Sequence, residues 1–138
     1  MIIRHGGALK NLQAQDQGAV VKVASQLVPM TGDGATVTVT DARPAKKFIL
    51  GITARVTTVV AGAALTTINI GDGTDADRYG AAILAAKDTR VGYGDATADP
   101  REWLTAAGNI VFTAVVGVFS SGVIRLDVHY LDLEVPSA

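Results

Sequence analysis

The sequence contains no cysteine, which excludes disulfide bridges, a thiol nucleophile and thiolate zinc sites. Charge is also sparse: 18% of the 138 residues are charged, and 12 Lys and Arg nearly balance 13 Asp and Glu, for a net charge of −1. A chain without a basic surplus gains little from releasing counterions on nucleic acid. We therefore expect no nucleic-acid partner.

Long apolar runs are missing as well. The opening stretch, MIIRHGGALKNLQAQDQG, lacks the apolar core of a secretory signal, and apolar runs elsewhere are interrupted by Gly, Thr or a charge well before membrane-spanning length. The sequence predicts no membrane partner, and any exit from the cell would take another route, such as lysis.

Alternation of apolar and polar side chains is the main pattern that is present. In GVIRLDVHYLDL, which begins at Gly122, the residues expected to face a core are Ile124, Leu126, Val128 and Tyr130. The residues expected on the opposite face are Arg125, Asp127 and His129. A period of two residues indicates a strand with one buried face.

Other segments share this period and are separated by turns rich in Gly, Pro, Asp and Asn. ATVTVTD alternates Val with Thr, and KFILGITARVTT predicts an inward set of Phe48, Leu50, Ile52, Ala54 and Val56. Further strands are expected at Val20–Val28, Leu65–Ile70, Trp103–Thr105 and Ile110–Val118. The segment Ala81–Lys87 is predicted as strand or irregular structure, with a short helix as the alternative.

This pattern predicts an all-β protein: an antiparallel β-sandwich, jelly-roll-like, formed by residues 20–138. Residues 1–19 are polar, rich in Gln and without strand alternation. We interpret them as an N-terminal arm or short helix that contacts a neighbouring subunit.

One glycine-rich stretch resembles a dinucleotide-binding turn. Gly71-x-Gly73-x-x-Ala76 follows a strand, and Asp95 lies about 20 residues further on, where an acid would bind a ribose. However, three carboxylates in and beside the turn would repel a pyrophosphate, the preceding strand alternates Thr with Ile, and no strand–helix repeats follow. We expect a surface loop there and no nucleotide cofactor.

The same three acids, Asp72, Asp75 and Asp77, raise the question of a cation site. Carboxylates and backbone carbonyls suit calcium, but the spacing is not that of an EF-hand and no closing Glu follows. Turn-forming Asp residues are common in β-proteins, so no metal is predicted and cation binding is left open.

Residues that could support catalysis are few. Asp127 and His129 are expected on one strand face, with Ser120 and Ser121 just before that strand. A triad needs a sheltered base and a nucleophile on a strained turn. The simpler interpretation of Arg125, Asp127 and His129 is a polar row facing solvent or a subunit, so no enzyme is predicted.

Aromatic residues make up only 5% of the chain. We expect the aromatic residues within strands to be core residues, namely Phe48, Phe112 and Tyr130. Tyr79, Tyr93 and Trp103 flank loops, where exposed rings either fill a subunit contact or stack on a sugar. The subunit contact is the favoured interpretation.

Residues 48–136 resemble a β-domain at the C-terminus of certain prophage-encoded virion proteins. The resemblance is carried by ILGITARVTTVVAGAALTTINIGD, by DRYGAAILAAKDTRVGYGD and by WLTAAGNIVFTAVVGVFSSGVIRLDVHYLDLEVP, most specifically at Gly122–Leu133. These motifs are structural, and no catalytic residues come with them.

The resemblance implies a protein of the bacteriophage virion, in a head decoration, fibre or tail appendage. It implies a capsid decoration or cement protein, or a head-fibre-type subunit, that forms a homo-oligomer, with a trimer preferred. Its expected partners are copies of itself and the major capsid protein or tail and portal neighbours, which the arm would contact. The alternative is a tail-associated receptor- or glycan-binding module.

Overall fold

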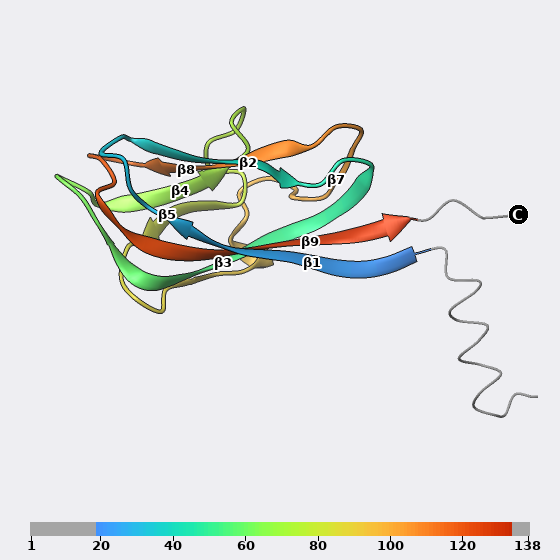
Figure 1. Ribbon diagram of the computed structural model, residues 1–138, viewed down its shortest axis with the longest axis horizontal. Helices are drawn as coiled ribbons and strands as arrows, with labels where there is room; N and C mark the ends of the chain where they lie inside the picture. Colours follow the sequence, from blue (N-terminus) through green and yellow to red (C-terminus); the bar gives the residue numbers. More distant parts are fainter. Residues whose placement is uncertain (1–18, 134–138) are drawn as a thin grey trace, which may run out of the picture.

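The computed structural model describes residues 19–133, which form two layers of antiparallel strands (Figure 1). The strands of this part of the chain are β1 (Ala19–Pro29), β2 (Thr36–Arg43), β3 (Lys47–Ala61), β4 (Thr67–Gly71), β5 (Gly80–Leu84), β6 (Arg90–Val91), β7 (Glu102–Leu104), β8 (Gly108–Ala114) and β9 (Ser121–Leu133). A short 3-10 helix, η1 (Tyr93–Asp95), follows β6. No helix in these residues is long and apolar enough to cross a membrane.

One layer is a five-stranded sheet in the order β1-β9-β3-β6, with β7 also paired to β3. The other is a four-stranded sheet in the order β2-β8-β4-β5. Consecutive strands β1 to β4 pass alternately from one layer to the other (Figure 1). The predicted antiparallel β-sandwich is therefore confirmed, while its jelly-roll character stays a prediction.

The core lies between the two layers and is formed by alternate residues of each strand. β9 contributes Ile124, Leu126 and Val128, and β8 contributes Ile110 and Phe112, all at most 2% exposed. Tyr130 packs partly buried against this cluster. The alternation predicted for β9 and the core position of Phe112 are confirmed, because both sheets bury one face and leave the other open.

The inward set predicted for β3 is correct only in its second half. Ile52, Ala54 and Val56 are buried, but Ile49 is also fully buried. The pairing register between β3 and β9 shifts between Ile49 and Gly51. One extra residue at this β-bulge reverses which side chains face inward. Phe48 therefore lies on the outer face, half-buried, and the prediction that it is a core residue is wrong.

The ambiguous segment Ala81–Lys87 contributes to strand β5, which pairs with β4, and the short-helix alternative is wrong. Ile83 packs toward the core, whereas Leu84 is exposed. The sequence did not predict β6 or η1, since two or three residues are too few to establish a period. The arm predicted for residues 1–19 lies outside the described residues, except for Ala19 in β1.

Candidate functional site

The outer face of the five-stranded sheet carries exposed aromatic, apolar and charged side chains. Residues paired across a ladder share a face. Leu131 of β9 pairs with Val21 of β1 and with Phe48 of β3, and Phe48 pairs in turn with Trp103 of β7. An apolar row therefore crosses four strands of this face, and Trp103 ends it with half of its surface exposed.

Tyr93 lies on the same face, in η1 next to the bulge of β3. An added Cβ at Gly51 would lie 2.9 Å from the Cδ2 atom of Tyr93, so the glycine leaves room for the ring. Tyr93 is 52% exposed and borders a small depression shared with Thr53 and His129. The expectation that Tyr93 and Trp103 are exposed rings is met, but no observation of the structure tests what they contact.

Tyr79 differs from the other two predicted rings. It is only 1% exposed and belongs to the core, so in this structure it cannot present a ring to a sugar or a subunit. Its backbone N–H donates to the carbonyl of Ile70, at the point where β4 and β5 begin to pair. The prediction of an exposed Tyr79 is wrong because Tyr79 directly precedes β5 and its side chain packs in the core, while Gly73 and Thr74 of the loop are exposed.

A buried ion-pair cluster next to Tyr79 ties this loop to other elements. Arg78 donates to Asp72 at 2.9 Å and to Glu102 at 3.2 Å, and its guanidinium lies over the Tyr79 ring at 5.6 Å from the centroid. Arg43 donates to the other oxygen of Glu102. The cluster joins the end of β2, the β4–β5 loop and β7, and its side chains are largely enclosed.

The Asp-rich loop uses its carboxylates internally. Asp72 accepts hydrogen bonds from the backbone N–H groups of Thr74 and Asp75 and from Arg78. Burial alone would raise the pKa of Asp72, but these hydrogen bonds outweigh it and hold the pKa below its ordinary value. Within residues 19–133, no group of three or more His, Cys, Asp or Glu side chains is arranged to hold a metal ion.

The glycines of the same loop have a structural explanation. At Gly71, an added Cβ would meet the carbonyl oxygen of Asp75 at 2.0 Å, and Gly73 has a φ of +90° that favours glycine. The segment ends in strand β5, and no helix follows whose N-terminus could receive a pyrophosphate. The glycine spacing therefore closes a tight loop between antiparallel strands.

The polar row predicted on β9 lies on the outer face, as expected. Arg125 pairs with Asp127 at 3.2 Å, and Nε2 of His129 lies 2.8 Å from Oγ1 of Thr53 on β3. Asp127 and His129 make no hydrogen bond to Ser120 or Ser121 among the interactions of the described residues. The residues considered for a triad are thus not assembled as one.

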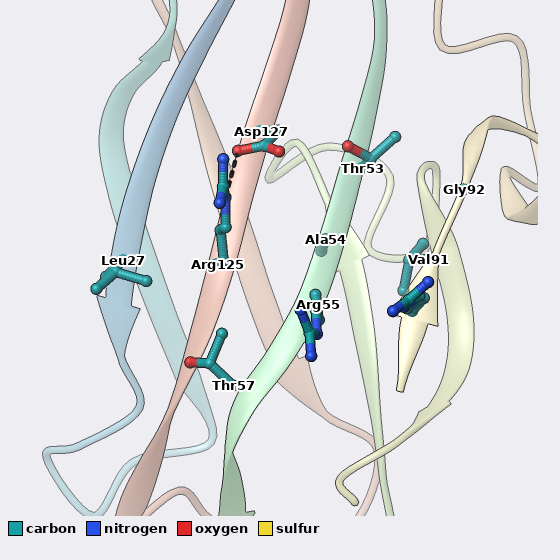
Figure 2. A pocket seen from close by; sticks show the side chains of 10 residues that line it. Leu27, Thr53, Ala54, Arg55, Thr57, Val91, Gly92, Arg125 and Asp127 are labelled. Atoms are coloured by element: carbon teal, nitrogen blue, oxygen red, sulfur yellow. Dashed lines mark hydrogen bonds and ion pairs between the residues drawn. The ribbon is translucent and has the colours of Figure 1, made fainter. Parts of the chain in front are cut away.

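The structure also assembles a group of arginines that the sequence did not reveal. Arg55 of β3 stands directly opposite Arg125 of β9 on one side and Arg90 of β6 on the other. These side chains line a cleft of about 630 Å³ on the outer face, together with Leu27 and Asp127 (Figure 2). Arg90 belongs to a two-residue strand with no readable period, so only the pairing register shows the arrangement.

Comparisons with known proteins give fold-level likeness only. No family model and no curated protein matches the chain. Among solved structures, a chain of the cyanophage Pam1 capsid asymmetric unit matches with a TM-score of 0.57 and 24% identity, over 95% of this chain and 91% of that chain. This likeness shows that nearly the whole length of both chains shares one fold.

Two further structures are more distant. A chain of the acid-stable capsid of Helicobacter pylori bacteriophage KHP30 has a TM-score of 0.48 and 11% identity, over 86% of this chain and 94% of that chain. The Drosophila NLP core has a TM-score of 0.40 and 14% identity, over 82% of this chain and 98% of that chain.

Proposed function

We propose that the protein is a non-enzymatic structural protein of a bacteriophage virion. The observation that carries the proposal is the likeness to a chain of the Pam1 capsid, which extends over 95% of this chain and therefore concerns the whole domain. The fold offers a rigid two-layer body with an outer face of exposed apolar and charged side chains. Such a body suits binding to neighbouring proteins in a shell.

Within the virion, the favoured role is a capsid decoration or cement protein, or a head-fibre-type subunit. Its edge strands support this role, because β1 leaves a long row of backbone groups that neighbouring subunits can cover. We propose assembly as a homotrimer and attachment to the major capsid protein, or to tail or portal neighbours, through residues 1–19. Many weak attachments on one lattice give a high combined affinity.

Mass spectrometry and cryo-electron microscopy of purified virions test the proposal. We expect the protein to be present at high copy number and to occupy a repeated position on the particle. Its absence from virions, with abundant protein in the infected cell, would refute a structural role. Light scattering of the purified protein then tests the trimer, and a monomer at all concentrations would contradict it.

A matched truncation tests the arm. Removal of residues 1–18 is expected to leave the domain folded, because the described strands begin at Ala19, and to abolish attachment to particles. Removal of residues 134–138 serves as the control and is expected to leave attachment unchanged. Undiminished attachment of the N-terminal truncation would contradict the role of the arm.

The second candidate is a tail-associated receptor- or glycan-binding module. The half-exposed rings of Tyr93 and Trp103 on one face favour it, because exposed aromatic rings stack on sugars. Saturable binding on a glycan array, lost in Trp103→Ala and retained in Val21→Ala, would support this module. The decoration role predicts no such binding.

A further inference from the structure

Three arginines form a cross-strand row on the outer face of the five-stranded sheet. Arg90, Arg55 and Arg125 occupy successive positions on β6, β3 and β9, paired directly in the ladder. Figure 2 shows Arg55 and Arg125 on the neighbouring strands β3 and β9, with Leu27 on β1, among the residues that line the cleft. The register places the Cα atoms of these three arginines side by side across the sheet.

This arrangement works against the stability of the sheet. Like charges directly opposite each other on neighbouring strands repel and destabilise the pair. Two acids relieve the repulsion in part: Asp88 pairs with Arg55 at 2.5 Å and Asp127 pairs with Arg125 at 3.2 Å. Arg55 and Arg125 nevertheless remain 48% and 53% exposed, so these pairs contribute little.

The side chain of Arg90 makes no hydrogen bond or ion pair with any residue in the described part of the chain. The pKa of Asp88 is held below its ordinary value first by the hydrogen bond from Arg55, and the nearby charges of Lys87 and Arg90 lower it further. The cleft therefore keeps an excess of positive charge on a protein whose net charge is −1. Because the row of like charges does not stabilise the fold, folding alone does not explain it.

The chemistry of the cleft selects its occupant. Guanidinium groups bind carboxylates through paired hydrogen bonds, and the exposed side chain of Leu27 at the edge of the cleft suits an uncharged stretch of polypeptide. A continuous polyanion such as DNA fits less well, because Asp88 and Asp127 lie among the arginines and would repel it. Spaced carboxylates on a protein segment avoid this repulsion.

We propose that the cleft docks an acidic segment of a neighbouring protein, whose carboxylates bind Arg55, Arg90 and Arg125. The inference rests on the proposed function, since it names the chemistry of the contact between this subunit and the shell. The contact is separate from the N-terminal arm and uses the rigid face of the domain.

Binding to a defined peptide tests the cleft in the isolated protein. The probe is a fluorescent peptide of alternating Glu and Ser, and its Gln–Ser counterpart, duplex DNA and inorganic phosphate are the comparison ligands. We expect the Glu peptide alone to bind, with an affinity that falls as salt is added. Tighter binding of DNA than of the Glu peptide would overturn the choice of occupant.

Single substitutions then locate the binding. Arg55→Gln and Arg90→Gln are each expected to weaken binding of the Glu peptide about tenfold, because each removes a charge-assisted hydrogen bond. Lys46→Gln, which removes an exposed positive charge outside the cleft, is the matched control and is expected to bind like the wild type. If both arginine variants bind the Glu peptide as tightly as the wild type does, the proposal is refuted.

Reconstitution on particles separates this inference from the proposed function. Wild-type protein is added to virions that lack it, beside Arg55→Gln, Arg90→Gln and Lys46→Gln. Loss of attachment in the arginine variants alone supports the cleft. Attachment of all four proteins alike refutes the cleft and leaves the virion role intact, whereas no attachment of the wild type counts against the virion role itself. Association of the wild type only with itself, lost in Arg55→Gln, would replace the acidic partner by a second copy.

Discussion

The protein holds its arginines in two contrasting ways. In the buried cluster, Arg43 and Arg78 are 8% and 18% exposed, and both bind Glu102. Arg43 also donates to the carbonyl of Asn109, and Arg78 to that of Asp99. In the outer row, Arg55 and Arg125 are about half exposed and face each other across the ladder.

The difference separates arginines that stabilise the fold from arginines that remain accessible to another molecule. An enclosed cation requires every partner that it can reach, because desolvation is costly. The buried cluster meets this requirement and joins segments that are distant in sequence. The outer row does not need to meet it, because water and an incoming ligand can satisfy its donors.

The largest expected effect comes from breaking the buried cluster. Glu102→Ala leaves Arg43 enclosed without its carboxylate, and we expect the free energy of unfolding to fall by about 3 kcal/mol in urea titrations. Asp99→Ala, which disrupts the exposed pair with Arg101, is the matched control and should change stability little. Equal losses in both variants would show that enclosure does not distinguish the two kinds of pair.

A smaller effect of opposite sign is expected at Tyr79. Its hydroxyl is buried and has no hydrogen-bond partner among the residues that the structure describes, so Tyr79→Phe should raise the free energy of unfolding by about 1 kcal/mol. Burial raises the pKa of Tyr79 from 10.0 to about 12, which means that the folded state favours the neutral phenol. The contribution of the neutral phenol to stability is fully present below pH 10 and is lost as the pH rises toward about 12.

Urea titrations across this pH range check the assignment to Tyr79. The wild type should lose stability over the interval, and Tyr79→Phe should lose less, because the variant has no phenol to ionise at that position. Identical pH profiles for the two proteins would mean that the alkaline loss arises from other groups.

The smallest effect is expected in the outer row. Arg55→Gln relieves repulsion from Arg90 and Arg125 while giving up the exposed pair with Asp88. We expect a change below about 0.5 kcal/mol, in the stabilising direction, by thermal unfolding. A marked loss of stability would show that the row has a structural role like that of the buried cluster.

Much of the fold was predictable because strand alternation is a local property. The inner and outer faces of β9, the position of Phe112 and most of the strands follow from a period of two residues. The bulge in β3 was not predictable, since an extra residue leaves no mark in an apolar run such as FILGI. It reverses the roles of Phe48 and Ile49.

The candidate site was predictable only in part. Loop composition indicated exposed rings at Tyr93 and Trp103, and alternation placed Arg125 and Asp127 outward. The same reasoning failed at Tyr79, because nothing in an Asp- and Gly-rich loop shows that the side chain just before β5 points into the core. The arginine row depends on which strands are neighbours, and that information arises only when residues distant in sequence pair.

The central position of β9 has a consequence for how the chain folds. β9 is hydrogen-bonded to both β1 and β3, and Ala19 pairs with Leu133 (Figure 1). The five-stranded sheet therefore cannot form until residues 121–133 have left the ribosome. During synthesis, β1 stays unpaired until β9 is available. Pairing strands so distant in sequence is slow, so we expect this domain to fold slowly, as other β-proteins with distant pairings do. We also expect the unpaired β1 to be prone to mispairing during synthesis.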